Sequence, residues 1–180
     1  MAGASVGRTF PLRPARMKSL LGMTLAILTG LATRDTAGVS SASPLQGTWV
    51  LVAADKRLPG GERAPDYGRS PAGRLMIDAE GRYALQIFKS ERIAFASGDK
   101  ARGNAEEYAS AVLGASTHYG VLEVDSRQGQ LTFRIERSSF PNWEGTVQRR
   151  QYTLEGNVLT YRVPARPDGS IPLSVWRKVE

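Results

Sequence analysis

The sequence has no cysteine and a single histidine among its 180 residues. A chain without cysteine has neither a disulfide framework nor a cysteine for lipid attachment. Zinc sites draw most of their ligands from sets of His and Cys side chains. One histidine, His118, therefore argues against zinc catalysis. We expect no metal and no cofactor.

Long apolar runs are also scarce. The longest uncharged apolar run, residues 19–32, has about 14 residues, whereas a spanning helix needs about 20. Arg13, Arg16 and Lys18 precede this run and small residues follow it, which is the pattern of a signal peptide. We therefore expect residues 1–42 to be a signal peptide and leader.

Two details of this leader stay open. Cleavage after Ala42 and cleavage after Gly38 both follow small residues, and either Met1 or Met17 can start translation. An exported and cleaved protein would end in the periplasm or the medium, with no stable membrane span. The alternative is an uncleaved membrane anchor.

A basic surface of the kind that binds nucleic acid is missing as well. The net charge of +7 comes from 24 basic and 17 acidic residues. Five of the bases and one of the acids lie in the first 43 residues, which leaves a net charge of +3 for the rest. The remaining charges are mixed in sign and form no basic stripe with interleaved aromatic residues. We expect no nucleic-acid partner.

The sequence does contain apolar and polar residues that alternate with period two. Leu131, Phe133 and Ile135 share one face of such a segment. Alternating segments bounded by Gly, Pro, Asn and Asp predict antiparallel strands joined by short turns. The predicted strands are 47–54, 73–78, 82–88, 117–125, 130–137, 146–154, 158–163 and 173–179. Residues 55–72 are rich in Pro and Gly and are predicted to form a long polar loop.

One short helix is predicted, at residues 105–113. Asn104 can accept an early backbone N–H as N-cap, and Glu106 and Glu107 lie where the helix dipole is positive. Gly114 is a natural stop. Eight strands and one helix, without repeats or βαβ spacing, predict an all-β fold. A sheet of this size removes its open edges by closing into a barrel or by folding into a sandwich.

Several motifs follow one another in a set order across this predicted sheet. They are Gly47-Thr48-Trp49-Val50-Leu51, Tyr67-Gly68-x-Ser70-Pro71-x-Gly73-x-Leu75, Asp78-x-Glu80-Gly81-Arg82-Tyr83, Phe140-Pro141-Asn142-Trp143-x-Gly145, Arg150-x-Tyr152 and Trp176-Arg177. The ordered set resembles the bacterial lipocalin-like domain family, from about Leu45 to Lys178. The resemblance implies an antiparallel up-and-down barrel of about eight strands with a small, apolar-to-mixed interior, formed by residues 43–180.

Candidate ligand-binding residues follow from such a barrel. Arg149 and Arg150 are adjacent, so one of them faces inward. Arg150 lies in the Arg-x-Tyr motif, and an inward guanidinium needs a partner or an anionic or carbonyl-bearing ligand. Tyr152 shares the face of Arg150, and Tyr161 lies on the next strand. Aromatic side chains with a polar tip suit a ligand cavity, and they suit a plain barrel core equally well.

Two further candidates are Trp143 and His118. Trp143 follows Pro141 and Asn142 in a loop and could close one end of the barrel. His118 begins a strand near the barrel rim. It could act as a general base, but no Ser or Cys nucleophile motif accompanies it. A surface position or a hydrogen-bonded structural role is the preferred interpretation.

Three functions fit this pattern. The first is an exported barrel that binds a small, apolar or amphiphilic ligand. The second is a small enzyme of the isomerase, cyclase or hydrolase type, with His118, a tyrosine or a carboxylate as acid or base. The third is a filled barrel that serves as a structural or interaction module. An open interior separates the first two from the third.

Barrel closure gives one more expectation. In an up-and-down barrel the first and last strands pair. Lipocalins resembling this chain place an Arg from near the chain end across the indole of the Gly-x-Trp motif. We therefore expect Trp49 to be buried, with Arg177 or Arg150 within about 6 Å of its ring centroid.

Overall fold

A computed structural model describes residues 42–179. The predicted signal peptide and leader, residues 1–42, lies outside the described residues except for its last position. Within the described part of the chain, no helix is long and apolar enough to cross a membrane.

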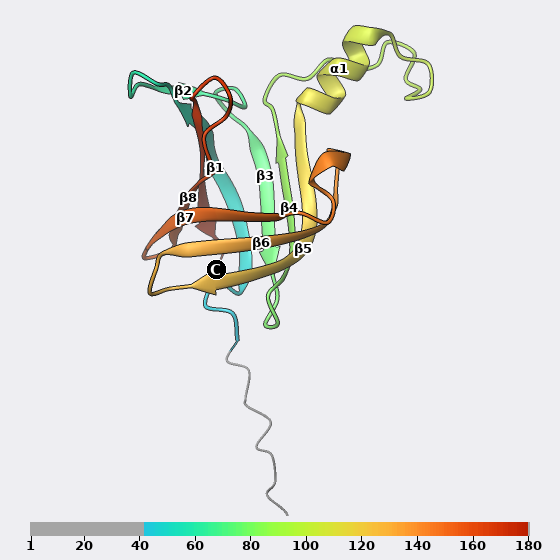
Figure 1. Cartoon of the computed structure of the whole chain (residues 1–180). Helices are drawn as coiled ribbons and strands as arrows, with labels where there is room; N and C mark the ends of the chain where they lie inside the picture. The colour runs from blue at the N-terminus through green and yellow to red at the C-terminus, as the bar shows by residue number, and fades with distance from the viewer. Residues whose placement is uncertain (1–41, 180) are drawn as a thin grey trace, which may run out of the picture. The chain divides into compact units, whose positions relative to one another are not determined.

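The described residues form an antiparallel β-barrel with one α-helix (Figure 1). In chain order the elements are β1 (Gly47–Arg57), β2 (Arg63–Pro65), β3 (Ala72–Ile77), β4 (Arg82–Phe88), α1 (Ala105–Leu113), β5 (Ala115–Asp125), β6 (Gln130–Ser138), the 3-10 helix η1 (Pro141–Trp143), β7 (Val147–Glu155), β8 (Val158–Arg162) and β9 (Ile171–Lys178). Successive strands are neighbours from β3 to β9, β1 pairs with β3, and β9 pairs back with β1. Eight strands thus close the barrel, and the short β2 pairs only with the end of β1.

The predicted all-β barrel with one short helix is confirmed. The prediction of an unbroken loop at residues 55–72 is wrong, because β1 continues to Arg57 and β2 lies within that stretch. The charged end of β1 is held by a partner strand, with Asp55 opposite Leu173 of β9. Pairing with two neighbours overrides the polar composition of the segment.

The two ends of the barrel are connected differently. At one end, tight turns join β3 to β4, β5 to β6 and β7 to β8, at residues 78–81, 126–129 and 156–157. At the other end lie all the long connections, which are residues 58–71, 89–114 with α1, 139–146 with η1, and 163–170. Figure 1 shows α1 beyond this second end, beside the start of β5. We call the two the turn end and the loop end.

The turn-end half of the interior is filled with side chains. Trp49, Trp176, Leu131 and Leu159 are all at most 1% exposed. The indole N–H of Trp49 donates to the carbonyl oxygen of Leu45 at 2.9 Å, so the buried ring keeps no unpaired donor. Burial on this scale makes this half a packed core.

The prediction that Trp49 is buried between paired first and last strands is confirmed. The prediction that an Arg covers its ring is wrong, because Lys178 Nζ lies 5.6 Å from the ring centroid instead. Arg177 follows the inward-facing Trp176, so the alternation of β9 turns it outward. Lys178 stands directly opposite Trp49 in the register.

Helix α1 begins with a complete capping box, as the sequence indicates. The Asn104 side chain accepts from the backbone N–H of Glu107 at 2.9 Å, and Glu107 Oε2 accepts from the N–H of Asn104 at 2.7 Å. Glu107 Oε1 also accepts from the N–H of Ala96. The first turn of α1 therefore also holds the connection that precedes it through the hydrogen bond to Ala96.

Candidate ligand-binding site

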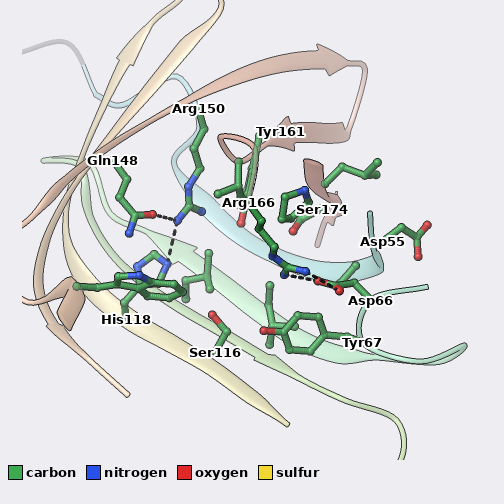
Figure 2. Close-up of a pocket in the computed structure, with 17 residues that line it drawn as sticks. Asp55, Asp66, Tyr67, Ser116, His118, Gln148, Arg150, Tyr161, Arg166 and Ser174 are labelled. Atoms are coloured by element: carbon green, nitrogen blue, oxygen red, sulfur yellow. Dashed lines mark hydrogen bonds and ion pairs between the residues drawn. The ribbon is translucent and has the colours of Figure 1, made fainter. Parts of the chain in front are cut away.

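A cavity of about 170 Å³ occupies the loop-end half of the barrel. It lies between the packed core and the long connections, and strands β1, β4, β5, β7, β8 and β9 all contribute to its wall. The apolar lining residues are Ala54, Leu85, Ile87, Trp143, Val163, Pro172 and Leu173. The polar lining residues are Asp55, Asp66, Tyr67, Ser116, His118, Gln148, Arg150, Tyr161, Arg166 and Ser174 (Figure 2). The interior of this barrel is therefore only partly filled.

Arg150, on β7, is the charged group deepest in the site. Its side chain is 5% exposed, and its guanidinium carbon lies 4.1 Å from the ring centroid of Phe133 and 5.1 Å from that of Tyr161. Nη2 donates to Gln148 Oε1 at 2.8 Å. Within residues 42–179 no carboxylate forms an ion pair with this guanidinium. The charge is held by two aromatic faces and a neutral amide.

Two of the residues that line the cavity each have a buried polar atom without a hydrogen-bond partner among the described residues. These atoms are Nε of Arg150 and the hydroxyl oxygen of Tyr161. Tyr161 is 1% exposed, and its ring stacks on Trp176 with 6.4 Å between centroids. Buried donors are almost always paired in folded proteins, so these two lining residues keep hydrogen-bonding capacity that the described residues do not use.

His118 lies between Arg150 and Tyr83. Its Nδ1 is 2.7 Å from the Tyr83 hydroxyl and its Nε2 is 3.4 Å from Arg150 Nη2. Arginine only donates, so Nε2 must accept, and the proton of the neutral ring sits on Nδ1 and is donated to the Tyr83 oxygen. Burial and the positive charge of Arg150 lower the pKa of His118 to about 3. At neutral pH the imidazole is uncharged and both nitrogens are engaged.

The outer part of the site is an ion-paired mouth. Arg166 donates to both oxygens of Asp66, at 2.9 and 2.6 Å, and Lys56 Nζ lies 3.7 Å from the same carboxylate. Asp55 is paired with Arg63. Figure 2 shows Asp55, Asp66 and Arg166 on the opposite side of the cavity from Gln148, Arg150 and His118. The carboxylates of the site are thus already neutralised at the mouth.

A second hollow adjoins the cavity on the outside. The two share Asp66, Tyr67, Ser116, Trp143 and Arg166. Three large apolar residues line the outer hollow and are strongly exposed. They are Val112 at 61%, Leu113 at 69% and Phe140 at 46%. Burial raises the pKa of Tyr67, which lies on the shared wall. The outer hollow gives an apolar route to the shared wall.

Four of the five candidate residues lie together on the cavity wall. They are Arg150, Tyr161, Trp143 and His118. The prediction that Arg150 faces the interior is confirmed. Tyr152 does not reach the cavity, because its hydroxyl lies toward the turn end, 3.4 Å from Ser126 Oγ. His118 is buried and hydrogen-bonded, as its preferred interpretation holds, although it lies inside the barrel instead of at its rim.

The residues at the mouth of the cavity were not predicted from the sequence. Asp66, Tyr67 and Arg166 belong to connections, and period-two alternation says nothing about connections. Tyr67 had a usable signal, since it opens one of the motifs of the resemblance. Ser116 lies on β5 one residue before the predicted start at residue 117, so extending that strand by one residue would have placed Ser116 on the same face as His118.

An up-and-down barrel with a packed floor, a part-polar cavity and long connections around its mouth defines the class of small-molecule-binding barrels. The model of the family described as the lipocalin-like domain matches residues 46–179. The chain belongs to this lipocalin-like domain family, which indicates ligand binding in general terms. A comparison with the curated proteins finds no match.

Proposed function

We propose that this protein is exported and reversibly binds a small, partly apolar molecule in the loop-end cavity. The observation that carries the proposal is a part-apolar cavity inside the barrel, two of whose lining residues have a buried polar atom without a partner. An apolar cavity of about 150 Å³ can hold a molecule of the size of benzene. A cavity of about 170 Å³ therefore fits a ligand built on a single ring or a short chain.

Binding is favoured over catalysis by the state of the titratable groups. His118 is neutral, has both nitrogens engaged and is a weak base with its pKa near 3. Asp66 is held by Arg166. A general acid or base needs a pKa near the working pH and a free position facing the substrate. The filled-barrel alternative is disfavoured by the cavity itself.

Thermal unfolding with one-ring probes tests the binding proposal. A bound probe raises the midpoint as its concentration increases, because it stabilises only the folded state. Phenol, benzamide and benzoate are suitable probes. Ser116→Phe should block the cavity and abolish the shifts. Thr117→Phe is the matched control, since the adjacent residue does not line the cavity. Equal shifts for both variants, or none for the unaltered protein, would refute cavity binding.

Export rests on the leader pattern alone. A fusion of residues 1–46 to a reporter should be exported and cleaved, because the leader has a basic start, an apolar run and small residues after it. Replacing Leu20, Leu25 and Leu28 by Asp is the control that removes the apolar run. Recovery of uncleaved, membrane-embedded fusion would contradict the proposal.

A further inference from the structure

We propose that the molecule bound in the cavity is a monocarboxylate, and that Arg150 and Tyr161 bind its carboxylate group. This inference rests on the proposed function and specifies the chemical class of its ligand. The carboxylate would lie at the inner wall, and the apolar part of the molecule would point toward the mouth.

The charge balance of the wall supports an anion. Four lining residues carry a formal charge, and three of them have an ion-pair partner. Arg150 is the exception within residues 42–179, although it is the most buried of the four. Keeping a charge out of water without a counter-charge is unfavourable, and arginine is almost never buried unless paired. A ligand anion supplies the missing counter-charge.

The hydrogen-bonding atoms support a carboxylate in particular. Arg150 Nε and the Tyr161 hydroxyl can each donate to an anionic oxygen. Their side chains share the inner face of adjacent strands, since Tyr161 pairs with Tyr152 and Arg150 is two positions away. Two oxygens on one carbon match two donors of this kind.

The neighbouring groups do not compete for the guanidinium. His118 accepts one Nη2 hydrogen and is uncharged, and Gln148 is a neutral acceptor. Asp66 and Asp55 belong to the mouth and are paired with Arg166 and Arg63. The arginines at the mouth are thus already paired with carboxylates, whereas Arg150 is not, so the inner end offers the cation without a counter-charge.

The test compares benzoate with benzamide, which has nearly the same shape and no charge. Hydrogen bonds to charged groups are worth more than neutral ones, and we expect benzoate to bind at least about tenfold more tightly by isothermal titration calorimetry. Arg150→Met should lower benzoate affinity at least about twentyfold and bring the two probes within about threefold of each other. Tyr161→Phe should lower benzoate affinity by about fivefold to tenfold.

Two matched variants control for general damage. Arg149→Met removes an exposed guanidinium from the same strand, and Tyr152→Phe removes a hydroxyl that faces away from the cavity. Both should leave benzoate affinity within about twofold of the unaltered protein. If Arg150→Met does not fold, an NMR titration of the unaltered protein, followed by the Nε–H signal of Arg150, still tests whether Arg150 binds the carboxylate. Benzoate should shift it, and benzamide should shift it less.

The outcomes separate this inference from the proposed function. Benzamide binding as tightly as benzoate, or a charge preference that persists in Arg150→Met, overturns the carboxylate and leaves cavity binding intact. Inorganic phosphate that binds as tightly as benzoate also overturns it, because the apolar part would then contribute nothing. If no one-ring probe binds at all, both proposals fail.

Discussion

The neutral state of His118 makes the stability of the barrel depend on pH. In the unfolded chain the imidazole titrates near its ordinary pKa of 6.5, whereas burial and Arg150 lower the pKa to about 3 in the folded protein. Between these values the unfolded state binds a proton that the folded state does not. The free energy of unfolding therefore falls as the pH is lowered through 6.5.

The size of this loss follows from the proton that the unfolded state takes up. Between pH 7.0 and 5.5 it amounts to about 1.2 kcal/mol for a group with an unfolded pKa of 6.5 that stays neutral when folded. Most carboxylates are ionised throughout this range. The sequence has no second histidine, so the loss belongs almost entirely to one side chain.

Urea unfolding followed by tryptophan fluorescence, at pH 7.0 and at pH 5.5, measures the loss directly. His118→Gln is the control, because an amide also has one acceptor and a donor but does not titrate here. The variant should lose less than about 0.3 kcal/mol over the same range. An equal loss in both proteins, or no loss in the unaltered one, would show that His118 is not held neutral by Arg150 and burial.

Two further predictions concern the packed turn-end half of the barrel and the bulge between β5 and β6. Trp49→Ala should lower the free energy of unfolding by about 3–5 kcal/mol, because it empties a fully buried site and removes the bond to Leu45; Trp49→Phe should cost clearly less in the same urea titration, and equal losses would contradict a packing origin. Gly120→Ala should lower the free energy of unfolding by about 1–3 kcal/mol, because the added Cβ would lie 2.0 Å from the carbonyl oxygen of Arg134 across the β5–β6 bulge. Gly156→Ala is the control for the loss of a glycine with positive φ, since a Cβ at this exposed position meets nothing. A loss at Gly120 no larger than the loss at Gly156 would contradict the close approach to Arg134.

The sequence predicts the strands well because alternation is a local property. It also predicts that one of the adjacent Arg149 and Arg150 faces inward, whereas the choice of Arg150 comes from the Arg-x-Tyr motif of the resemblance. It does not predict height along the barrel. Tyr152 and Tyr161 are opposite each other in the register and face the same way, yet only Tyr161 reaches the cavity. The tilt and stagger of the strands in a closed barrel set that height. Neither can be derived from the sequence of a single strand.

Only those residues of the candidate site that lie on strands could be predicted from the sequence. Arg150 and Tyr161 lie on strands, where the alternation of inward and outward residues can be read from the sequence. Asp66 and Arg166, in contrast, pair across two connections that are 100 positions apart. No periodicity relates two loops. The exchange of an expected arginine for Lys178 over Trp49 has the same origin, since the exact register of β1 and β9 decides which cation stands opposite the ring.

The pairing of β1 with β9 has a consequence for how the chain can be cut. Trp49 and Lys178 are partners although they are about 130 positions apart, and the N–H of Val179 donates to the carbonyl of Thr48. Such long-range pairs raise the contact order and slow folding, because a long loop must close before they form. The same proximity lets a short linker join residue 179 to residue 43. A circular permutant opened at the tight 156–157 turn would then retain every strand pair while making the β9–β1 pair local. Because the same opening makes β7–β8 the long-range pair in place of β9–β1, the permutant should fold at a rate close to that of the natural strand order.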